Sequence, residues 1–306
     1  MASAALTVDG LSKHYEGIRA VDGVNFSVGE GEMFGIVGPD GAGKTTLFRM
    51  LCGIIRPGGG SAAIFGKNIA EHQEAVKREI GYFSQKFTLY GDLTVDENME
   101  FFAEIHEVFD YMERREELLE FTRLAPFRKR RADRLSGGMK QKLALACTLI
   151  HRPKVIFLDE PTTGVDPLSR TDFWRILSGL LKSGITIVMS TPYMDEAERC
   201  GRIALMNNGR LMAVDSPANV KKMLDGVVLE VHCADVRGAQ RALKNDPGMM
   251  DVQAIGGRLN VVVASAAAGH AAVALALGKN GIAITGWREI NPSLENVFIS
   301  LVTRAA

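Results

Sequence analysis

The stretch Gly38-Pro-Asp-Gly-Ala-Gly-Lys-Thr-Thr46 decides the fold of this 306-residue chain. It follows a short apolar run, Glu32–Val37, and precedes a helical pattern from Thr45 to Cys52. A strand, a glycine-rich loop and a helix in this order open an α/β nucleotide-binding fold. The glycines let consecutive backbone N–H groups turn toward one phosphate. The motif therefore predicts a phosphate-binding loop made of Gly38, Pro39, Asp40, Gly41, Ala42, Gly43, Lys44, Thr45 and Thr46.

Two side chains of this loop carry specific chemistry. Lys44 adds a positive charge at the β- and γ-phosphates, and Thr45 offers a hydroxyl to Mg²⁺. The helix that starts at Thr45 also points its positive end toward the same anion. A nucleoside phosphate with Mg²⁺ is therefore the expected ligand.

A second motif, Val155-Ile-Phe-Leu-Asp159-Glu160, places two carboxylates after four apolar residues. Four consecutive apolar residues are typical of a parallel strand that is buried on both faces. Such a strand would deliver Asp159 to the Mg²⁺ ion and Glu160 beside the γ-phosphate, where Glu160 acts as general base on the attacking water. A strand that ends in a solvated acidic turn is the simpler alternative, and the glycine-rich loop upstream argues against it.

A third motif, Leu135-Ser-Gly-Gly-Met-Lys-Gln141, predicts a helix with Ser136 as its N-cap. Gly137 and Gly138 expose backbone N–H groups at the start of this helix, which is a second place for an anion. Taken alone, an ordinary capped helix explains the motif equally well. Its position between the other two motifs favours a role in the nucleotide site.

The remaining chain predicts further strands and a second domain. Ile185–Ser190 is another apolar strand, and Asn208-Gly209 predicts a tight turn between strands at 203–206 and 211–214. The composition shifts near Ser216-Pro217. From there the expected elements are strand 227–233, helix 235–245, strands 250–255 and 258–264, helix 266–279, strand 282–287 and a last helix 293–303. This order predicts a small split β-α-β domain.

Charge, cysteines and hydropathy exclude several classes of protein. Lys and Arg number 36 and so do Asp and Glu, so no net field draws the chain to nucleic acid, and we expect no nucleic-acid partner. The four cysteines, Cys52, Cys147, Cys200 and Cys233, form no metal-binding or disulfide pattern, which favours a reducing cytoplasm. The uncharged run Leu259–Gly278 is rich in alanine, and we expect a strand and a helix there rather than a membrane span.

In their order and spacing, these motifs resemble the ATP-binding cassette (ABC) transporter ATPases over about residues 5–220. The resemblance implies an α/β P-loop ABC ATPase domain at 1–220, with a mixed sheet core and a helical subdomain at about 88–150. An α+β ferredoxin-like accessory domain follows at 221–306. The resemblance also implies that Tyr15 stacks on adenine and that Gln85 contacts Mg²⁺ and the attacking water. It further implies a head-to-tail dimer in which Ser136, Gly137 and Gly138 reach the γ-phosphate bound by the other cassette, and in which Asp166 links the two sites.

The ending Asn291–Phe298 and the segment Met194–Glu198 are similar to the ABC-2 export subfamily, which includes drug-resistance exporters. That similarity implies an ATP-binding and ATP-hydrolysing subunit that powers an exporter through a separate integral membrane permease. A second cassette, identical or different, would complete the pair. The chain would then be cytoplasmic and peripheral on the inner face of the cell membrane.

One position departs from the family pattern, and two alternatives follow from the motifs. Pro192 stands where a histidine is expected to face the γ-phosphate, and proline has no donor for that phosphate. The chain could therefore be a weakly hydrolysing partner of a competent cassette. Asp40, where Asn is commoner, is a milder departure. A chromosome or DNA-repair ATPase is the other alternative, but Ser136 comes only 92 positions after Lys44, which leaves no room for long coiled coils.

Overall fold

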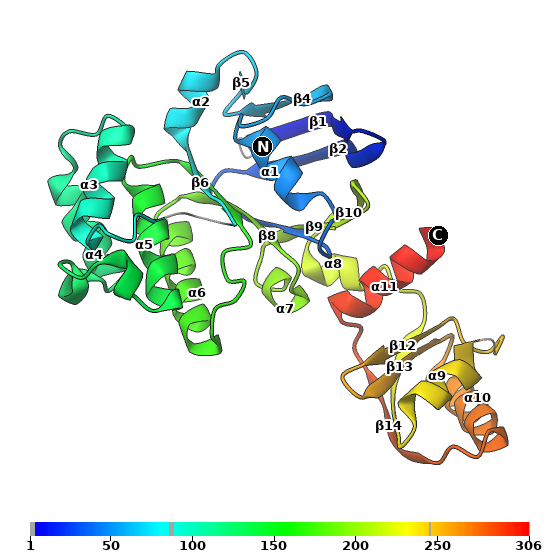
Figure 1. The fold of residues 1–306 in the computed structure, drawn as a ribbon. Helices are drawn as coiled ribbons and strands as arrows, with labels where there is room; N and C mark the ends of the chain where they lie inside the picture. Colours follow the sequence, from blue (N-terminus) through cyan, green and yellow to red (C-terminus); the bar gives the residue numbers. More distant parts are fainter. Residues whose placement is uncertain (1–3, 86–88, 245, 306) are drawn as a thin grey trace. The chain divides into compact units, whose positions relative to one another are not determined.

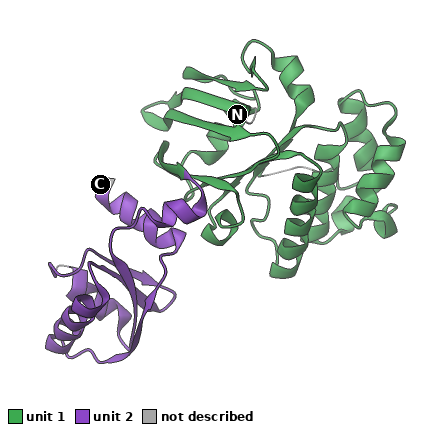
Figure 2. Cartoon of the chain, turned by 180° about the vertical axis from the view of Figure 1, so that it is seen from behind, with its two compact units in different colours: residues 1–214 green, residues 215–306 purple. Residues whose placement is uncertain are grey.

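The computed structural model describes residues 4–85, 89–244 and 246–305 (Figure 1). The chain divides into two compact units between Val214 and Asp215 (Figure 2). The division lies six residues before the expected boundary at 220, because α8 (Pro217–Lys221) belongs to the second unit. Ser216, where the composition changes, is the N-cap of α8 and accepts a hydrogen bond from the backbone of Asn219.

A six-stranded sheet forms the centre of the first unit, in the order β10-β9-β3-β8-β7-β6. Its strands, in this order, are Arg210–Asp215, Arg202–Asn207, Met33–Val37, Thr186–Thr191, Val155–Asp159 and Ile80–Phe83. The pairs of β3 with β8 and β9, of β7 with β8, and of β6 with β7 are parallel. Every residue of β3, β7 and β8 is buried, which confirms the three apolar runs as interior strands.

A four-stranded antiparallel sheet lies beside this core, in the order β2-β1-β4-β5. It consists of β1 (Ala4–Tyr15), β2 (Ile18–Gly29), β4 (Gly59–Ile64) and β5 (Lys67–Asn68). Its apolar side chains share one hydrophobic core with α1 (Lys44–Leu51) and with the central sheet. The helix that carries Lys44 is therefore packed from two sides.

Helices make up most of residues 95–149, which lie in the sequence between the glycine-rich loop and β7 (Figure 1). They are α3 (Val95–Ile105), α4 (Tyr111–Phe121) and α5 (Gly137–Leu149), with short 3-10 turns at Ala125–Phe127 and Ala132–Arg134. Arg128 joins the first two, with its guanidinium 2.8 Å from Asp96 and 2.7 Å from Glu116. α2 (Gln73–Glu79) precedes this segment, and α6 (Pro167–Lys182) and α7 (Met194–Ala197) follow it.

The second unit is a ferredoxin-like α+β domain, as the order of its elements predicts. Its sheet runs β12-β13-β11-β14, and every neighbouring pair is antiparallel. The strands are β11 (Val227–Cys233), β12 (Asp251–Ile255), β13 (Arg258–Val263) and β14 (Ile284–Ile290). Its helices α9 (Val236–Lys244) and α10 (Ala266–Lys279) share a separate hydrophobic core with the sheet, and α11 (Leu294–Ala305) contacts α8.

Two further expectations concern the same chain. The uncharged run Leu259–Gly278 forms part of β13 and most of α10, and among the described residues no helix is both long and apolar enough to cross a bilayer.

All four cysteines are free thiols, and Cys52, Cys147 and Cys200 are buried, as their apolar surroundings predict. Burial raises the pKa of each of these three thiols.

Candidate nucleotide-binding site

The loop between β3 and α1 curls around the ammonium group of Lys44. This side chain is only 3% exposed, and its Nζ donates hydrogen bonds to the carbonyl oxygens of Gly38 at 2.9 Å and Pro39 at 3.0 Å. Gly43, the N-cap of α1, has a φ of +104°, and a Cβ there would overlap the carbonyl oxygen of Ala20. Only glycine fits this position, because the conformation is left-handed and no space remains for a side chain.

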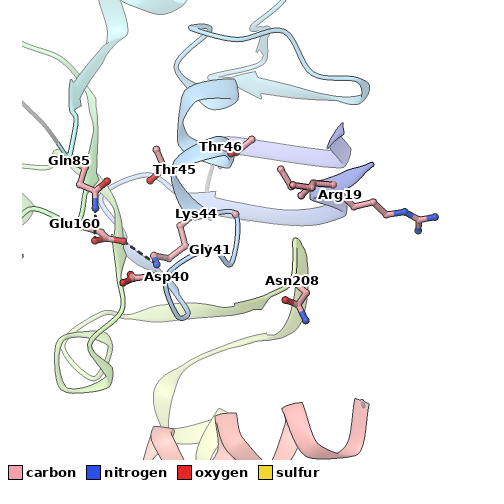
Figure 3. A pocket seen from close by; sticks show the side chains of 12 residues that line it. Arg19, Asp40, Gly41, Lys44, Thr45, Thr46, Gln85, Glu160 and Asn208 are labelled. Atoms are coloured by element: carbon pink, nitrogen blue, oxygen red, sulfur yellow. Dashed lines mark hydrogen bonds and ion pairs between the residues drawn. The ribbon is translucent and has the colours of Figure 1, made fainter. Parts of the chain in front are cut away.

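A buried carboxylate forms an ion pair with the ammonium group of Lys44. Oε1 of Glu160 lies 3.1 Å from the Lys44 Nζ, and the Glu160 side chain is 5% exposed. Its other oxygen accepts hydrogen bonds from Gln85 Nε2 at 3.0 Å and from the Thr163 hydroxyl at 3.4 Å. Figure 3 shows Gln85 and Lys44 converging on Glu160. The carboxylate thus holds the place of an anion beside the lysine that is expected to bind phosphate.

Asp159, the last residue of β7, lies fully buried next to this pair. Ser190 donates a hydrogen bond to its Oδ1 at 2.6 Å, and the Tyr82 hydroxyl lies 3.5 Å from its Oδ2. Burial raises the pKa of Asp159, and the hydrogen bonds from Ser190 and Thr45 act in the opposite direction. A cation near this carboxylate would offset the cost of its burial.

The oxygen donors around Asp159 are of the kind that suits Mg²⁺. Thr45, whose side chain acts to lower the pKa of Asp159, and Gln85 both line the neighbouring cavity. Within the described part of the chain, no cluster of three or more His, Cys, Asp or Glu side chains could hold a metal ion by itself. Magnesium in nucleotide sites is usually held by one or two protein oxygens together with phosphates, so these residues fit such an ion.

Thr45 and Gln85 belong to the wall of a cavity of about 640 Å³, which Asp159 itself does not line. The predicted residues at its wall are Asp40, Gly41, Gly43, Lys44, Thr45, Thr46, Gln85 and Glu160 (Figure 3). Sequence reasoning missed Ile18, Arg19 and Ala20 at the start of β2 and Asn208 in the turn between β9 and β10. The Asn208-Gly209 turn was predicted, but its contact with the phosphate loop was not. The backbone N–H of Gly209 donates to the carbonyl oxygen of Ala42 in that loop at 2.9 Å, and no local sequence pattern indicates this contact.

Comparison with known proteins agrees with this geometry. The family model described as ABC transporter matches residues 21–163. The daunorubicin/doxorubicin resistance ATP-binding protein DrrA of Streptomyces peucetius is 36% identical over 251 residues, which are 80% of this chain and 76% of that protein. The chain belongs to the ABC transporter family. The ATP-binding cassettes of this family are ATPases coupled to transport.

Two further similarities describe what this cassette matches. The probable multidrug ABC transporter ATP-binding protein YbhF of Escherichia coli is 43% identical over 251 residues, which are 80% of this chain. The chain spans only 43% of the length of that relative. The dimeric post-hydrolysis structure of the cassette MJ0796 with ADP and Pi aligns with a TM-score of 0.62 at 26% identity, over 69% of this chain and 98% of that one.

Other predicted residues of the cassette lie outside the cavity. Ser136 is the N-cap of α5, as predicted, and Gly138 packs directly against Ser169 at the start of α6. Asp166 caps α6 by accepting hydrogen bonds from the backbone N–H groups of Leu168 and Ser169. The starts of these two helices therefore lie together, but none of these residues lines the wall around Lys44. Tyr15, 45% exposed at the end of β1, is also absent from that wall.

Pro192 follows the last residue of β8 directly. Thr191, the residue before it, accepts a hydrogen bond from the backbone N–H of Gly38 at 3.3 Å, so the proline lies next to the start of the phosphate loop. The hydroxyl of Thr191 donates to Glu196 at 2.7 Å. Because Lys44, Gln85, Asp159 and Glu160 are all in place, the alternative of a weakly hydrolysing cassette gains no support from this site.

Proposed function

We propose that this chain is the ATP-binding and ATP-hydrolysing subunit of an ABC exporter, acting on a separate integral membrane permease at the cytoplasmic face of the membrane. The observation that carries the proposal is the convergence of Lys44 and Gln85 on Glu160 in one cavity. The names of the relatives, which refer to multidrug transport and to drug resistance, favour export.

Glu160 is the proposed general base. When the phosphates of ATP enter the loop, they take over the positive charge of Lys44, and the Glu160 carboxylate is released from its ion pair. The freed carboxylate accepts a proton from the water that attacks the terminal phosphate, and Gln85 orients both groups. Glu160 is held in place because its backbone N–H donates to the carbonyl oxygen of Ser190 and to its hydroxyl.

Thr45 and Asp159 are the residues that we propose to hold Mg²⁺, with Gln85 beside them. When bound, the ion would supply positive charge that offsets the negative charge developing during phosphoryl transfer. Asp159 is suited to this role because the Ser190 hydroxyl already orients its carboxylate at the buried end of β7.

A second cassette is the proposed partner within the transporter. Ser136 and Gly137 are exposed at the N-terminus of α5, and Gly138 is buried beside them. Backbone N–H groups at this terminus can bind a phosphate held by the other cassette. Asp166, at the adjacent start of α6, would lie between the two sites. Tyr15, exposed near the first residues of β2 that line the cavity, is the proposed platform for adenine.

Phosphate release from ATP by the purified chain tests the proposed function. We expect turnover that requires Mg²⁺ and stops when EDTA is added, because the phosphates and Asp159 together need a divalent cation. The assay is repeated with the permease encoded next to the gene, if the genome holds one. ATP binding without turnover in both arms would contradict the proposal.

Pro192→His should raise turnover, by up to about 10²-fold, with little change in ATP affinity. A histidine next to the phosphate loop could donate a hydrogen bond to the terminal phosphate in the transition state, and proline cannot. Ground-state binding should hardly change, because the loop around Lys44 is untouched. Steady-state phosphate release gives kcat and KM for the comparison.

Pro192→Ala is the matched control, since it removes the proline without adding a donor. A similar gain in both variants would assign the effect to backbone freedom and contradict a hydrogen-bonding role. No gain in Pro192→His would mean that position 192 does not face the phosphate.

A further inference from the structure

A buried carboxylate outside the cavity joins the two chain segments that flank the reaction site. Glu196, on α7, is 1% exposed. Its Oε1 accepts a hydrogen bond from the Thr162 hydroxyl at 2.5 Å, and its Oε2 accepts one from the Thr191 hydroxyl at 2.7 Å. Each oxygen of one side chain therefore holds a different segment.

The Thr162 side leads to the general base. Thr162 is two residues after Glu160 and is itself 1% exposed. The next residue, Thr163, donates its backbone N–H to the Glu160 carbonyl at 3.3 Å and its hydroxyl to the Glu160 carboxylate at 3.4 Å. A shift of Thr162 would therefore move a group that contacts the base.

The Thr191 side leads to the phosphate loop. The Thr191 carbonyl oxygen accepts from the N–H of Gly38, and its hydroxyl oxygen accepts from the N–H of Tyr193 at 3.1 Å. Because its hydrogen is already donated to Glu196, this hydroxyl is committed on both sides. Glu196 thus fixes the residues on either side of Pro192.

The surroundings of this carboxylate compensate its burial in part. Burying a carboxylate costs free energy that two neutral hydroxyl groups do not fully offset. An ion pair with Nε of Arg170 at 3.6 Å offsets more of it, and the Arg170 guanidinium also stacks over the ring of Tyr193 at 4.8 Å. Buried ion pairs often stabilise a fold no more than apolar side chains of the same size do, so stability alone does not account for Glu196.

We infer that Glu196 is a positioning residue for hydrolysis, which holds the segment of Glu160 and the segment of Gly38 in register through Thr162 and Thr191. The inference rests on the proposed function. The Thr162–Glu196–Thr191 hydrogen bonds connect the two segments without any contribution from the side chain at position 192. Loss of these hydrogen bonds should slow the chemical step and leave nucleotide binding nearly unchanged, because misplacement of reacting groups by a fraction of an ångström is costly in rate.

Glu196→Gln tests the inference, because glutamine keeps the shape of the side chain but has only one acceptor oxygen. We expect kcat to fall by about tenfold, with KM and the affinity for ADP changed by less than about twofold. ADP titration does not depend on hydrolysis and so isolates binding. Glu113→Gln, on the exposed surface of α4, is the control and should behave as wild type, because Glu113 lies outside this network.

Three outcomes decide the matter. Normal kcat in Glu196→Gln would overturn the inference and leave the proposed function standing. A parallel loss of kcat, ADP affinity and melting temperature would assign Glu196 a merely structural role and overturn the inference as well. An absence of turnover in the wild type would contradict the proposed function, and with it the inference.

A second pair of variants keeps the test sharp if Glu196→Gln does not fold. Thr162→Val and Thr191→Val each remove one hydroxyl with little change of shape. If Glu196 couples the two segments, the double variant should lose less kcat than the product of the two single losses. Independent, multiplicative losses would overturn the inference.

Discussion

Glu160→Gln should slow ATP hydrolysis by about 10²-fold or more while the nucleotide stays bound. The amide cannot accept the proton of the attacking water, and the loop that binds the phosphates is unchanged. With ATP, the variant should also run at doubled mass in size-exclusion chromatography, because the closed pair is no longer opened by hydrolysis. Single-turnover phosphate release measures the rate.

The ion pair with Lys44 adds a second expectation for the same variant. Glu160 competes with phosphate for the ammonium group at 3.1 Å, so its neutral substitute should bind ADP more tightly than the wild type does. Glu113→Gln, on the exposed surface of α4, is the control and should change neither quantity. A Glu160→Gln chain that hydrolyses ATP at the normal rate would refute the assignment of the base.

Lys44→Ala should weaken ATP binding by about 10- to 100-fold, the equivalent of one lost charged hydrogen bond of about 1.5–3 kcal/mol. It should also destabilise the fold by about 3 kcal/mol, because Glu160 then lies buried without its counter-charge. Nucleotide titration and urea unfolding measure the two effects separately.

The double variant Lys44→Ala with Glu160→Gln distinguishes these effects. It should regain most of the lost stability, since no buried charge is left unpaired, but it should not regain ATP affinity. Unchanged affinity in Lys44→Ala would count against the phosphate loop, and equal instability of the single and double variants would count against the ion pair.

Local patterns predicted the central sheet well, because parallel strands buried on both faces are continuous apolar runs. Val155–Leu158 and Ile185–Ser190 became β7 and β8 almost residue for residue. The edge sheet was harder to predict, since its strands mix polar and apolar residues. β1 extends over Ala4–Tyr15 and carries several register shifts, so no continuous apolar run marks it.

The candidate site divides in the same way. Lys44, Asp159 and Glu160 belong to motifs whose residue types and spacing indicate phosphate and metal binding, so they could be found without a structure. Arg19 and Asn208 line the cavity because distant strands bring them there, and nothing in their neighbours along the chain indicates it. The contacts of Glu196 could not be predicted from the sequence, where this residue only belongs to a segment that matches a family pattern. Its hydrogen bond with Thr162 joins residues 34 positions apart, and such a contact leaves no periodic signal.

The position of β3 in the sequence has a consequence for co-translational folding. Its two partners in the sheet, β8 and β9, follow it in the sequence by more than 150 residues. The glycine-rich loop therefore leaves the exit tunnel long before the strands that hold its base exist, and β3 has two unpaired edges during that time. Nascent chains that end within the helical segment should bind no nucleotide, and binding should first appear when the turn at Asn208 has emerged.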